Sequence, residues 1–194
     1  MLSVVIATQD SERTLVPTLA ALVSGAVAGV VREVIVTDAG SHDATTRIAE
    51  GAGCRVAISP ESRGARLKAA TLAARAPWLL FLAPGLVPDA TWIDECKRFI
   101  EQAELTQTAD QRAAGFREVS ASFRPMLIEA LALLHAALGG GPHAGLLIAK
   151  SLYERLGGHR ADAKEPERDL ANRLGRRRLV LLRTGAIMAS PDIA

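Results

Sequence analysis

The sequence has few cysteines and little net charge, and each shortage excludes a class of protein. Its 194 residues include only two cysteines, Cys54 and Cys96, which are far apart and lack the spacing of metal ligands. We expect them to be buried thiols in a reducing compartment rather than a disulfide. The formal net charge is only +2, so the composition does not indicate a polyanionic partner such as a nucleic acid.

The sequence also lacks an apolar run long enough to span a bilayer. Its most apolar segment, Met126 to Ala149, is interrupted by Glu129, by His135 and by the break Gly139-Gly140-Gly141-Pro142. The first residues, MLSVVIATQD, have neither the basic start nor the cleavage site of a signal peptide. We therefore expect a cytoplasmic protein without a transmembrane segment.

Glycine-rich nucleotide fingerprints are absent as well. The G-x-G-x-x-G sequence that dinucleotide dehydrogenases place after a strand follows none of the expected strands. Nucleotidyltransferases usually carry a glycine-rich loop with arginine and lysine after their first strand. The corresponding loop here, ATQDSER, has no glycine. Both classes of enzyme are therefore disfavoured.

The first hundred residues instead alternate between strand-like and helical patterns. Four short apolar runs predict strands: Leu2 to Ala7, a run centred on Val34 to Val36, Cys54 to Ile58, and Trp78 to Leu82. The first two are expected to be buried. Helical patterns start near Asp10 or Ser11, run from about Asp43 to Glu50, and run from Arg63 to Arg75. Short connections between them predict right-handed βαβ units and a parallel sheet. The length suits one well-cored domain.

The second half is less regular. Helices are expected at about Ala90 to Glu104, Pro125 to Leu138, Ser151 to Leu156 and Glu167 to Leu174. Strands are expected at Phe116 to Phe123 (antiparallel), Gly145 to Ala149, Leu179 to Leu182 and Ala186 to Ala189. We expect these elements to complete a cleft against the first half.

The stretch Val31 to Thr45, VREVIVTDAGSHDAT, is the most informative for function. Its strand ends at Asp38, which Gly40 follows closely, and open α/β sheets bind their ligands at the carboxyl ends of strands. Asp38 either contacts such a ligand or only binds main-chain N–H groups of the turn, where Gly40 would supply a positive φ. These residues alone leave both interpretations open.

Several blocks, in order along the chain, resemble the family-2 glycosyltransferases. They are SVVIATQDSERTL, VREVIVTDAGSHDAT, SRGARLKAA, WLLFLAPGLVPDATWIDE, LLIAKSLYERLGG and ERDLANRLGRRRLVLL. The resemblance implies an α/β fold of the GT-A type, a Rossmann-like, mostly parallel sheet with helices on both faces. It implies a single domain with a nucleotide-binding half at 1–104 and an acceptor and catalytic half at 105–194. The substrate implied is a nucleotide-diphosphate sugar.

The resemblance also implies roles for individual residues. The loop Ala7, Thr8, Gln9 and Asp10 would line the nucleotide pocket, and Asp38, beside Gly40, would accept a hydrogen bond from the base. Arg63 and Gly64 would lie beside the diphosphate at a helix start, where anions are favoured. Glu167 falls nearest the family's catalytic carboxylate, which takes the proton of the acceptor hydroxyl. Glu165 is the alternative for that role.

The chain departs from the family where a divalent cation usually binds. The Asp-x-Asp pair that follows the fourth strand in relatives is replaced by Ala83-Pro84-Gly85, which has no carboxylate. Asp89, the next carboxylate, is expected to cap the following helix. We therefore expect no metal and no cofactor besides the nucleotide-sugar donor. Two further motifs are altered, to Gly141-Pro142-His143 and to Pro166-Glu167.

Cationic side chains offer a replacement for the metal. Arg66 and Lys68 follow Arg63 on the same expected helix and would neutralise a diphosphate, since arginine binds phosphate in a bidentate manner. The alternative is a solvated helix face. The cluster Arg173 to Arg178 would similarly meet an anionic lipid or a phosphate-bearing acceptor, or simply be solvated.

Two hypotheses follow for function. The first is a metal-independent sugar transferase with an unknown acceptor, a lipid or a glycan, and peripheral membrane contact. The alternative is a non-catalytic relative that acts as a nucleotide-binding or regulatory partner, because several polar positions of the family's site are altered together.

Overall fold

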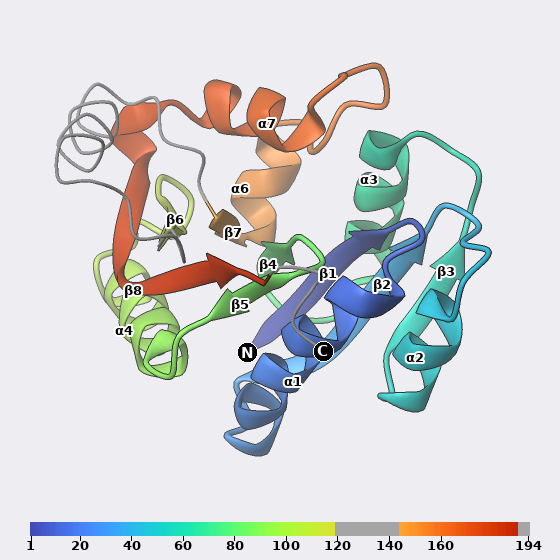
Figure 1. The fold of residues 1–194 in the computed structure, drawn as a ribbon. Helices are drawn as coiled ribbons and strands as arrows, with labels where there is room; N and C mark the ends of the chain where they lie inside the picture. Colours follow the sequence, from blue (N-terminus) through green and yellow to red (C-terminus); the bar gives the residue numbers. More distant parts are fainter. Residues whose placement is uncertain (119–143, 190–194) are drawn as a thin grey trace, which may run out of the picture.

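A computed structural model describes residues 1–118 and 144–189, and the strands among them form one eight-stranded sheet (Figure 1). The strands are β1 (Leu2–Thr8), β2 (Val31–Asp38), β3 (Arg55–Ile58), β4 (Trp78–Leu82), β5 (Leu86–Pro88), β6 (Ala113–Glu118), β7 (Ala144–Ala149) and β8 (Leu179–Met188). Their order across the sheet is β3-β2-β1-β4-β7-β6-β8-β5, so strands from both halves of the sequence share a single sheet.

The first half is a parallel α/β unit, as the alternating pattern predicts. Strands β3, β2, β1 and β4 all run parallel. The helices that connect them are α1 (Glu12–Val27), α2 (Thr45–Gly51) and α3 (Arg63–Ala73). In right-handed crossovers, the direction in which the chain moves across the sheet decides which face the connecting helix covers. The chain moves from β1 through β2 to β3 in one direction, so α1 and α2 cover one face. It then returns past β1 to β4, so α3 covers the other face (Figure 1). The carboxyl ends of β1 and β2 therefore meet at one edge.

The second half adds antiparallel pairings, which makes the complete sheet mixed. Strand β7 runs antiparallel to β4, and β6 runs antiparallel to β7. Strand β8 is parallel to β6 and antiparallel to β5. The helices of this half are α4 (Trp92–Leu105), α6 (Lys150–Arg155) and α7 (Pro166–Leu174), and α7 is followed by a short 3-10 turn, η1 (Arg176–Arg178).

The strands of this half differ from the expected ones in three respects, and one expected helix lies outside the described residues. The two expected final strands are one continuous β8, because Thr184 and Gly185 bond to Asp89 and keep the chain extended. Strand β5 was not expected, since its three residues form a strand only by pairing with β8. Strand β6 begins at Ala113 rather than Phe116 and pairs antiparallel with β7. The expected helix from Pro125 lies outside the described residues.

The core follows the apolar runs of the sequence. Every residue of β1 is buried, and the largest fully buried side chains include Trp78, Trp92 and Phe116. Both cysteines are free: Cys96 is fully buried and Cys54 is half-buried. Burial raises the pKa of the Cys54 thiol to about 11 and that of Cys96 to about 12. Within the described ranges, no helix is long and apolar enough to cross a membrane.

Candidate active site

The loops after β1 and β2 are joined to each other at the carboxyl edge of the sheet. The bonds between them include Asp10 N–H to Ser41 Oγ (2.8 Å), His42 N–H to Asp10 Oδ1 (2.8 Å), Glu12 N–H to Asp43 Oδ2 (3.0 Å) and Ala44 N–H to Glu12 Oε2 (3.0 Å). Asp10 holds a φ of 44°, a conformation that non-glycine residues rarely adopt. Its neighbour Gln9 is exposed. The two loops therefore form one fixed rim.

Asp38 lies beneath this rim and is fully enclosed, with no exposed surface. Its Oδ1 accepts from the N–H groups of Gly40 (2.8 Å) and Ser41 (2.6 Å). Its Oδ2 accepts from the hydroxyls of Thr8 (2.7 Å) and Ser41 (2.6 Å). Burial alone would raise the pKa of this carboxyl, but the bonds from Ser41, Thr8 and Gly40 hold the pKa below its usual value.

These contacts favour the loop-organising interpretation of Asp38. A carboxylate has about four acceptor positions, and all four are occupied by donors of the protein itself. A nucleotide base would have to displace one of these donors to reach the carboxylate. Gly40 has a φ of 91°, the positive value that the turn requires. The two residues thus shape the rim.

Arg66 is buried, with 5% of its surface exposed, and does not lie on a solvated helix face. Its Nη1 donates to the main-chain oxygens of Thr8 (3.1 Å) and Thr37 (2.6 Å), and its Nε donates to that of Glu61 (3.2 Å). Burial lowers the pKa of the guanidinium, and the nearby Arg63 lowers it further. Arg66 therefore joins the ends of β1 and β2 from below, and most of its donors are engaged by main-chain carbonyls.

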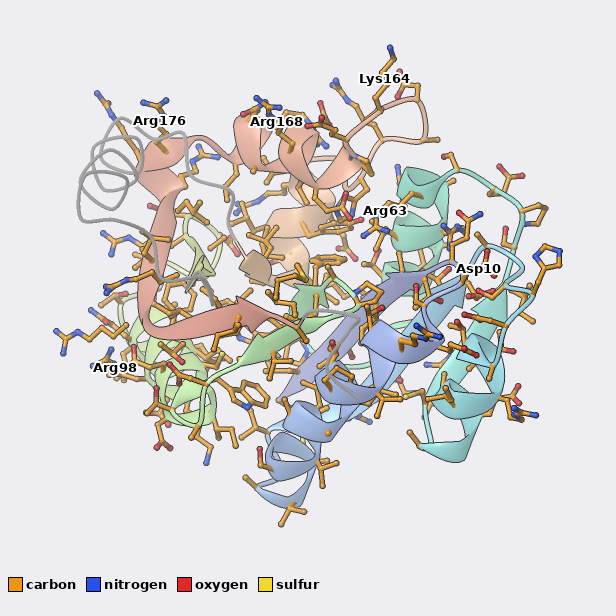
Figure 2. The ribbon with its side chains drawn as sticks, in the orientation of Figure 1. Asp10, Arg63, Arg98, Lys164, Arg168 and Arg176 are labelled. Atoms are coloured by element: carbon orange, nitrogen blue, oxygen red, sulfur yellow. The ribbon has the colours of Figure 1, made fainter. Side chains whose placement is uncertain are left out.

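Arg63 lies one helical turn before Arg66 and connects the two halves of the chain. Its Nε donates to Glu167 Oε1 at 2.6 Å, and its Nη1 donates to the main-chain oxygen of Ala7 at 3.3 Å. Figure 2 shows Arg63 and Asp10 at the end of the sheet where β1 stops. Both members of the ion pair remain accessible, with 39% and 45% of their side chains exposed. Residues 104 positions apart thus meet at the rim.

Gly64 has a packing role at the start of α3. A Cβ atom at this position would overlap the main-chain carbonyl of Arg160. Ser62, the N-cap of α3, accepts from Ala65 N–H and donates from the same hydroxyl to the main-chain oxygen of Ala161 at 2.7 Å. The segment that leads into α7 therefore covers the first turn of α3. Ser62 was not expected here, although a serine before a helical run is a recognisable cap.

Two further candidates lie away from the rim. Glu165 is exposed and pairs with Arg168 on its own helix, with Nη1 to Oε2 at 3.1 Å. Lys68 is exposed and lines a cavity of about 130 Å³ with Tyr153, Gly157 and other residues of α3 and α6. Of the two glutamates considered for the base, only Glu167 contacts another candidate residue.

A buried histidine lies behind the ion pair. His159 is 1% exposed, its Nδ1 is 2.9 Å from the hydroxyl of Tyr153, and its ring packs edge-on against Phe81. Its Nε2 has no hydrogen-bond partner among the described residues. Burial lowers the pKa of His159 to about 4, against an opposing effect of Glu167, so the imidazole is neutral near pH 7. No local sequence pattern indicates the contact between His159 and Tyr153. The altered motif Gly141-Pro142-His143 lies outside the described residues.

The residues after β4 do not fit a divalent cation. Ala83, Pro84 and Gly85 offer no side-chain oxygen, and Gly85 N–H donates to Thr18 Oγ1 at 2.9 Å. Asp89 is engaged elsewhere. It accepts from Thr184 Oγ1, from the N–H and hydroxyl of Thr91 and from Gly185 N–H. In the part of the chain that is described, no group of three or more His, Cys, Asp or Glu residues could hold a metal.

A second cavity lies on the α3 side of the sheet. It measures about 190 Å³ and is lined by Thr37, Arg66, residues of β3 and the alanines of α3. This volume is below the roughly 300–1,000 Å³ of typical small-molecule pockets. This cavity is therefore too small for a whole nucleotide sugar. Among the described residues, the rim is where Asp10, Arg63 and Glu167 come together.

Comparison with known proteins identifies the family. The model of "Glycosyl transferase family 2" matches residues 3–181, which is most of the chain. The chain belongs to glycosyltransferase family 2. This membership confirms the resemblance read from the ordered sequence blocks, and it supports sugar transfer as the general activity. A search of curated proteins found no match.

Solved glycosyltransferase structures share the fold. The structure of S. aureus TarS 1-349 superposes with a TM-score of 0.75 at 16% identity, covering 98% of this chain and 60% of that one. The same fragment in complex with UDP-GlcNAc gives a TM-score of 0.72 at 15% identity, covering 97% of this chain and 58% of that one. The family-2 chain thus spans about three fifths of the TarS fragment.

A second solved structure shares the fold as well. Glucosyl-3-phosphoglycerate synthase from Mycobacterium tuberculosis, in complex with Mn2+, UDP and glucosyl-3-phosphoglycerate, gives a TM-score of 0.64 at 20% identity. The alignment covers 97% of this chain and 70% of that one. At these identities the likeness shows the fold, which is the GT-A-type α/β fold expected from the sequence.

Proposed function

We propose that this family-2 glycosyltransferase transfers a sugar from a nucleotide-diphosphate donor to a hydroxyl acceptor without a divalent cation. Arg63 is the cation that meets the diphosphate, and Glu167 is the base. The observation that carries the proposal is the meeting of these two residues at the carboxyl end of β1, the edge where open α/β sheets bind ligands.

The donor class is supported by the solved relatives. TarS was solved with UDP-GlcNAc, and the mycobacterial synthase was solved with UDP. For this chain the rim formed by Thr8, Gln9 and Asp10 is the proposed nucleotide surface, with Asp38 and Gly40 holding it in shape. Arg66 supports the rim from beneath rather than binding the diphosphate.

The chemistry requires one proton acceptor and one diphosphate contact. A Glu167 carboxylate oxygen takes the proton of the acceptor hydroxyl as that oxygen bonds to the anomeric carbon of the sugar. The bond between the anomeric carbon and the diphosphate oxygen breaks, and its electron pair leaves with the diphosphate. The Arg63 guanidinium stabilises the charge that develops there, because guanidinium–phosphate hydrogen bonds are charge-assisted.

The acceptor is proposed to be a lipid or a glycan at a surface rich in cations. Arg176, Arg177 and Arg178 of η1 are all exposed, and Lys164 and Arg168 lie on the outer side of the neighbouring segment (Figure 2). Arg173 does not belong to this surface, because Asp169 and the carbonyls of Leu156 and Gly158 engage it. Exposed cations of this kind attract anionic lipid headgroups or phosphate-bearing acceptors.

A non-catalytic nucleotide-binding relative is the second candidate. Two observations favour it: the loop after β4 lacks carboxylates, and Arg63 holds the proposed base in an ion pair. Such a protein would bind UDP or GDP at the rim without turning over a donor.

Donor turnover separates the two candidates. Purified protein treated with EDTA is incubated with UDP-glucose, UDP-GlcNAc and GDP-mannose, and release of the nucleoside diphosphate is measured with membrane-lipid and glycan extracts as acceptors. Release that survives EDTA and is lost in Glu167→Gln supports the transferase. Nucleotide binding without release by any donor supports the binding protein.

A further inference from the structure

The Arg63–Glu167 ion pair joins the two groups that the proposed function assigns to opposite substrates. Arg63 belongs to α3 of the first half, and Glu167 belongs to the first turn of α7. In the structure, Glu167 Oε1 accepts the Nε–H of Arg63 at 2.6 Å. Arg63 therefore occupies one carboxylate oxygen of the proposed base, and Glu167 occupies the Nε–H edge with which the guanidinium would meet a diphosphate.

The ion pair is not needed to hold the two halves together. The segment before α7 is fastened to the start of α3 by the Ser62–Ala161 hydrogen bond and by the close packing of Gly64 on Arg160. The two charged side chains are 39% and 45% exposed, and exposed ion pairs stabilise a fold only weakly. The pair is thus free to exchange partners while the surrounding backbone stays in place.

Arg63 also has a second anchor at the rim. Its Nη1 donates to the main-chain oxygen of Ala7, at the end of β1. The guanidinium is therefore held beside the proposed nucleotide surface whether or not Glu167 accepts from it. A diphosphate at the rim would compete with Glu167 for the Nε–H edge of the same guanidinium, because arginine binds phosphate with two parallel donors.

We propose that the Arg63–Glu167 pair is a latch that the donor opens. This inference rests on the proposed function. The diphosphate of the donor takes over the guanidinium of Arg63, and Glu167 is released to act as the base for the acceptor hydroxyl. Glu167 Oε1 is thus released from Arg63 when a donor is bound, which makes donor binding the step that precedes proton transfer to this oxygen.

The latch predicts that removing the proposed base increases the affinity for UDP. Removing the charge of Glu167 removes the competitor for Arg63, so Glu167→Gln should bind UDP more tightly than the wild type. Since exposed ion pairs contribute up to about 1 kcal/mol, the expected gain in UDP affinity is roughly two- to fivefold. Uridine, which lacks the diphosphate, should bind both proteins equally.

The test is a set of calorimetric titrations of UDP and uridine, and of GDP and guanosine, into EDTA-treated protein. Glu165→Gln is the matched control, because it removes the same charge two residues away, where the carboxylate pairs with Arg168. It measures how much the affinity for an anion rises when any negative charge in this region is removed. Glu167→Ala is a second variant without the carboxylate, in case the glutamine amide bonds to Arg63.

The latch is supported if Glu167→Gln and Glu167→Ala both gain diphosphate affinity beyond Glu165→Gln while nucleoside affinity is unchanged. It is overturned if the wild type binds UDP or GDP and the Glu167 variants bind no more tightly than Glu165→Gln. It is overturned together with the proposed function if the wild type binds no nucleotide at all.

Discussion

Gly64 packs directly against the main-chain carbonyl of Arg160, with no room between them for a methyl group. The contact brings the first turn of α3 against the segment that carries Glu167. The position of the proposed base relative to Arg63 therefore depends on a residue without a side chain.

Gly64→Ala should separate these two segments. The added methyl group overlaps main-chain atoms that cannot rotate away, so we expect a loss of unfolding free energy of about 1–3 kcal/mol and reduced turnover. Urea denaturation measures the first effect. Gly51→Ala is the matched control, because a Cβ there meets nothing within 4 Å, and it should be neutral or stabilising. Equal stability of Gly64→Ala and the wild type would show that the contact is dispensable.

Asp38→Asn should destabilise the fold rather than act on nucleotide binding alone. The side-chain amide of the variant would point its N–H groups at Thr8, Gly40 or Ser41, which now donate to the carboxylate. The expected loss of unfolding free energy is about 2–4 kcal/mol. Because the folded-state pKa of Asp38 is lowered, its stabilisation is present above the unfolded pKa and is lost as pH falls through the folded pKa. Asp162→Asn, at an exposed loop position, is the control. Undiminished stability with selectively weakened nucleotide binding would instead favour the base contact.

Arg66→Leu tests whether this arginine is a support or a phosphate ligand. Its removal takes one donor from each of the carbonyls of Thr8, Thr37 and Glu61, in a buried position, so we expect thermal unfolding at a lower temperature and a loss of about 2–4 kcal/mol. Arg47→Leu, at an exposed position of α2, should cost far less. A stable Arg66→Leu protein that had lost only diphosphate affinity would restore the phosphate role.

His159 should make stability fall on mild acidification. Burial lowers its pKa from 6.5 to about 4 in the folded protein, so the unfolded chain binds the proton more readily between these values. Stability is full above pH 6.5 and decreases toward pH 4, by at most about 3 kcal/mol for this shift. Chemical denaturation between pH 4 and 7 measures the slope, which His159→Phe should reduce and His42→Gln, at an exposed position, should not. An unchanged slope in His159→Phe would assign the acid sensitivity to other groups.

Local patterns were sufficient to predict the parallel half of the fold. The β-branched runs around Val5 and Ile35 are buried strands, because such side chains fill both faces of a covered sheet. The sequence was less informative for β5 and β8, whose extent depends on pairing with each other. Pairing between distant segments is a tertiary effect that local periodicity does not record.

The candidate site could be predicted only in part, because several of its contacts also join segments that are distant in the sequence. Arg66 shares the inner face of α3 with Leu67 and Ala70, whereas Lys68 falls on the outer face. That spacing is a signal for the burial of Arg66, which neither the diphosphate interpretation nor the solvated-face interpretation used. The four donors around Asp38 come from two separate loops, so its saturation was not evident from the stretch VREVIVTDAGSHDAT. The Arg63–Glu167 contact joins residues 104 positions apart and is a property of the assembled fold.

The central claim is that Arg63 takes the place of a divalent cation at the diphosphate. The most direct measurement compares the affinities of UDP and uridine, and of GDP and guanosine, in EDTA, for the wild type and for Arg63→Gln, with Arg168→Gln as a control arginine. We predict that the wild type and the control bind the diphosphate more tightly than the nucleoside without metal, and that Arg63→Gln loses this difference while keeping its nucleoside affinity. A preference for the diphosphate that appears only after manganese is added, or that persists in Arg63→Gln, would contradict the claim.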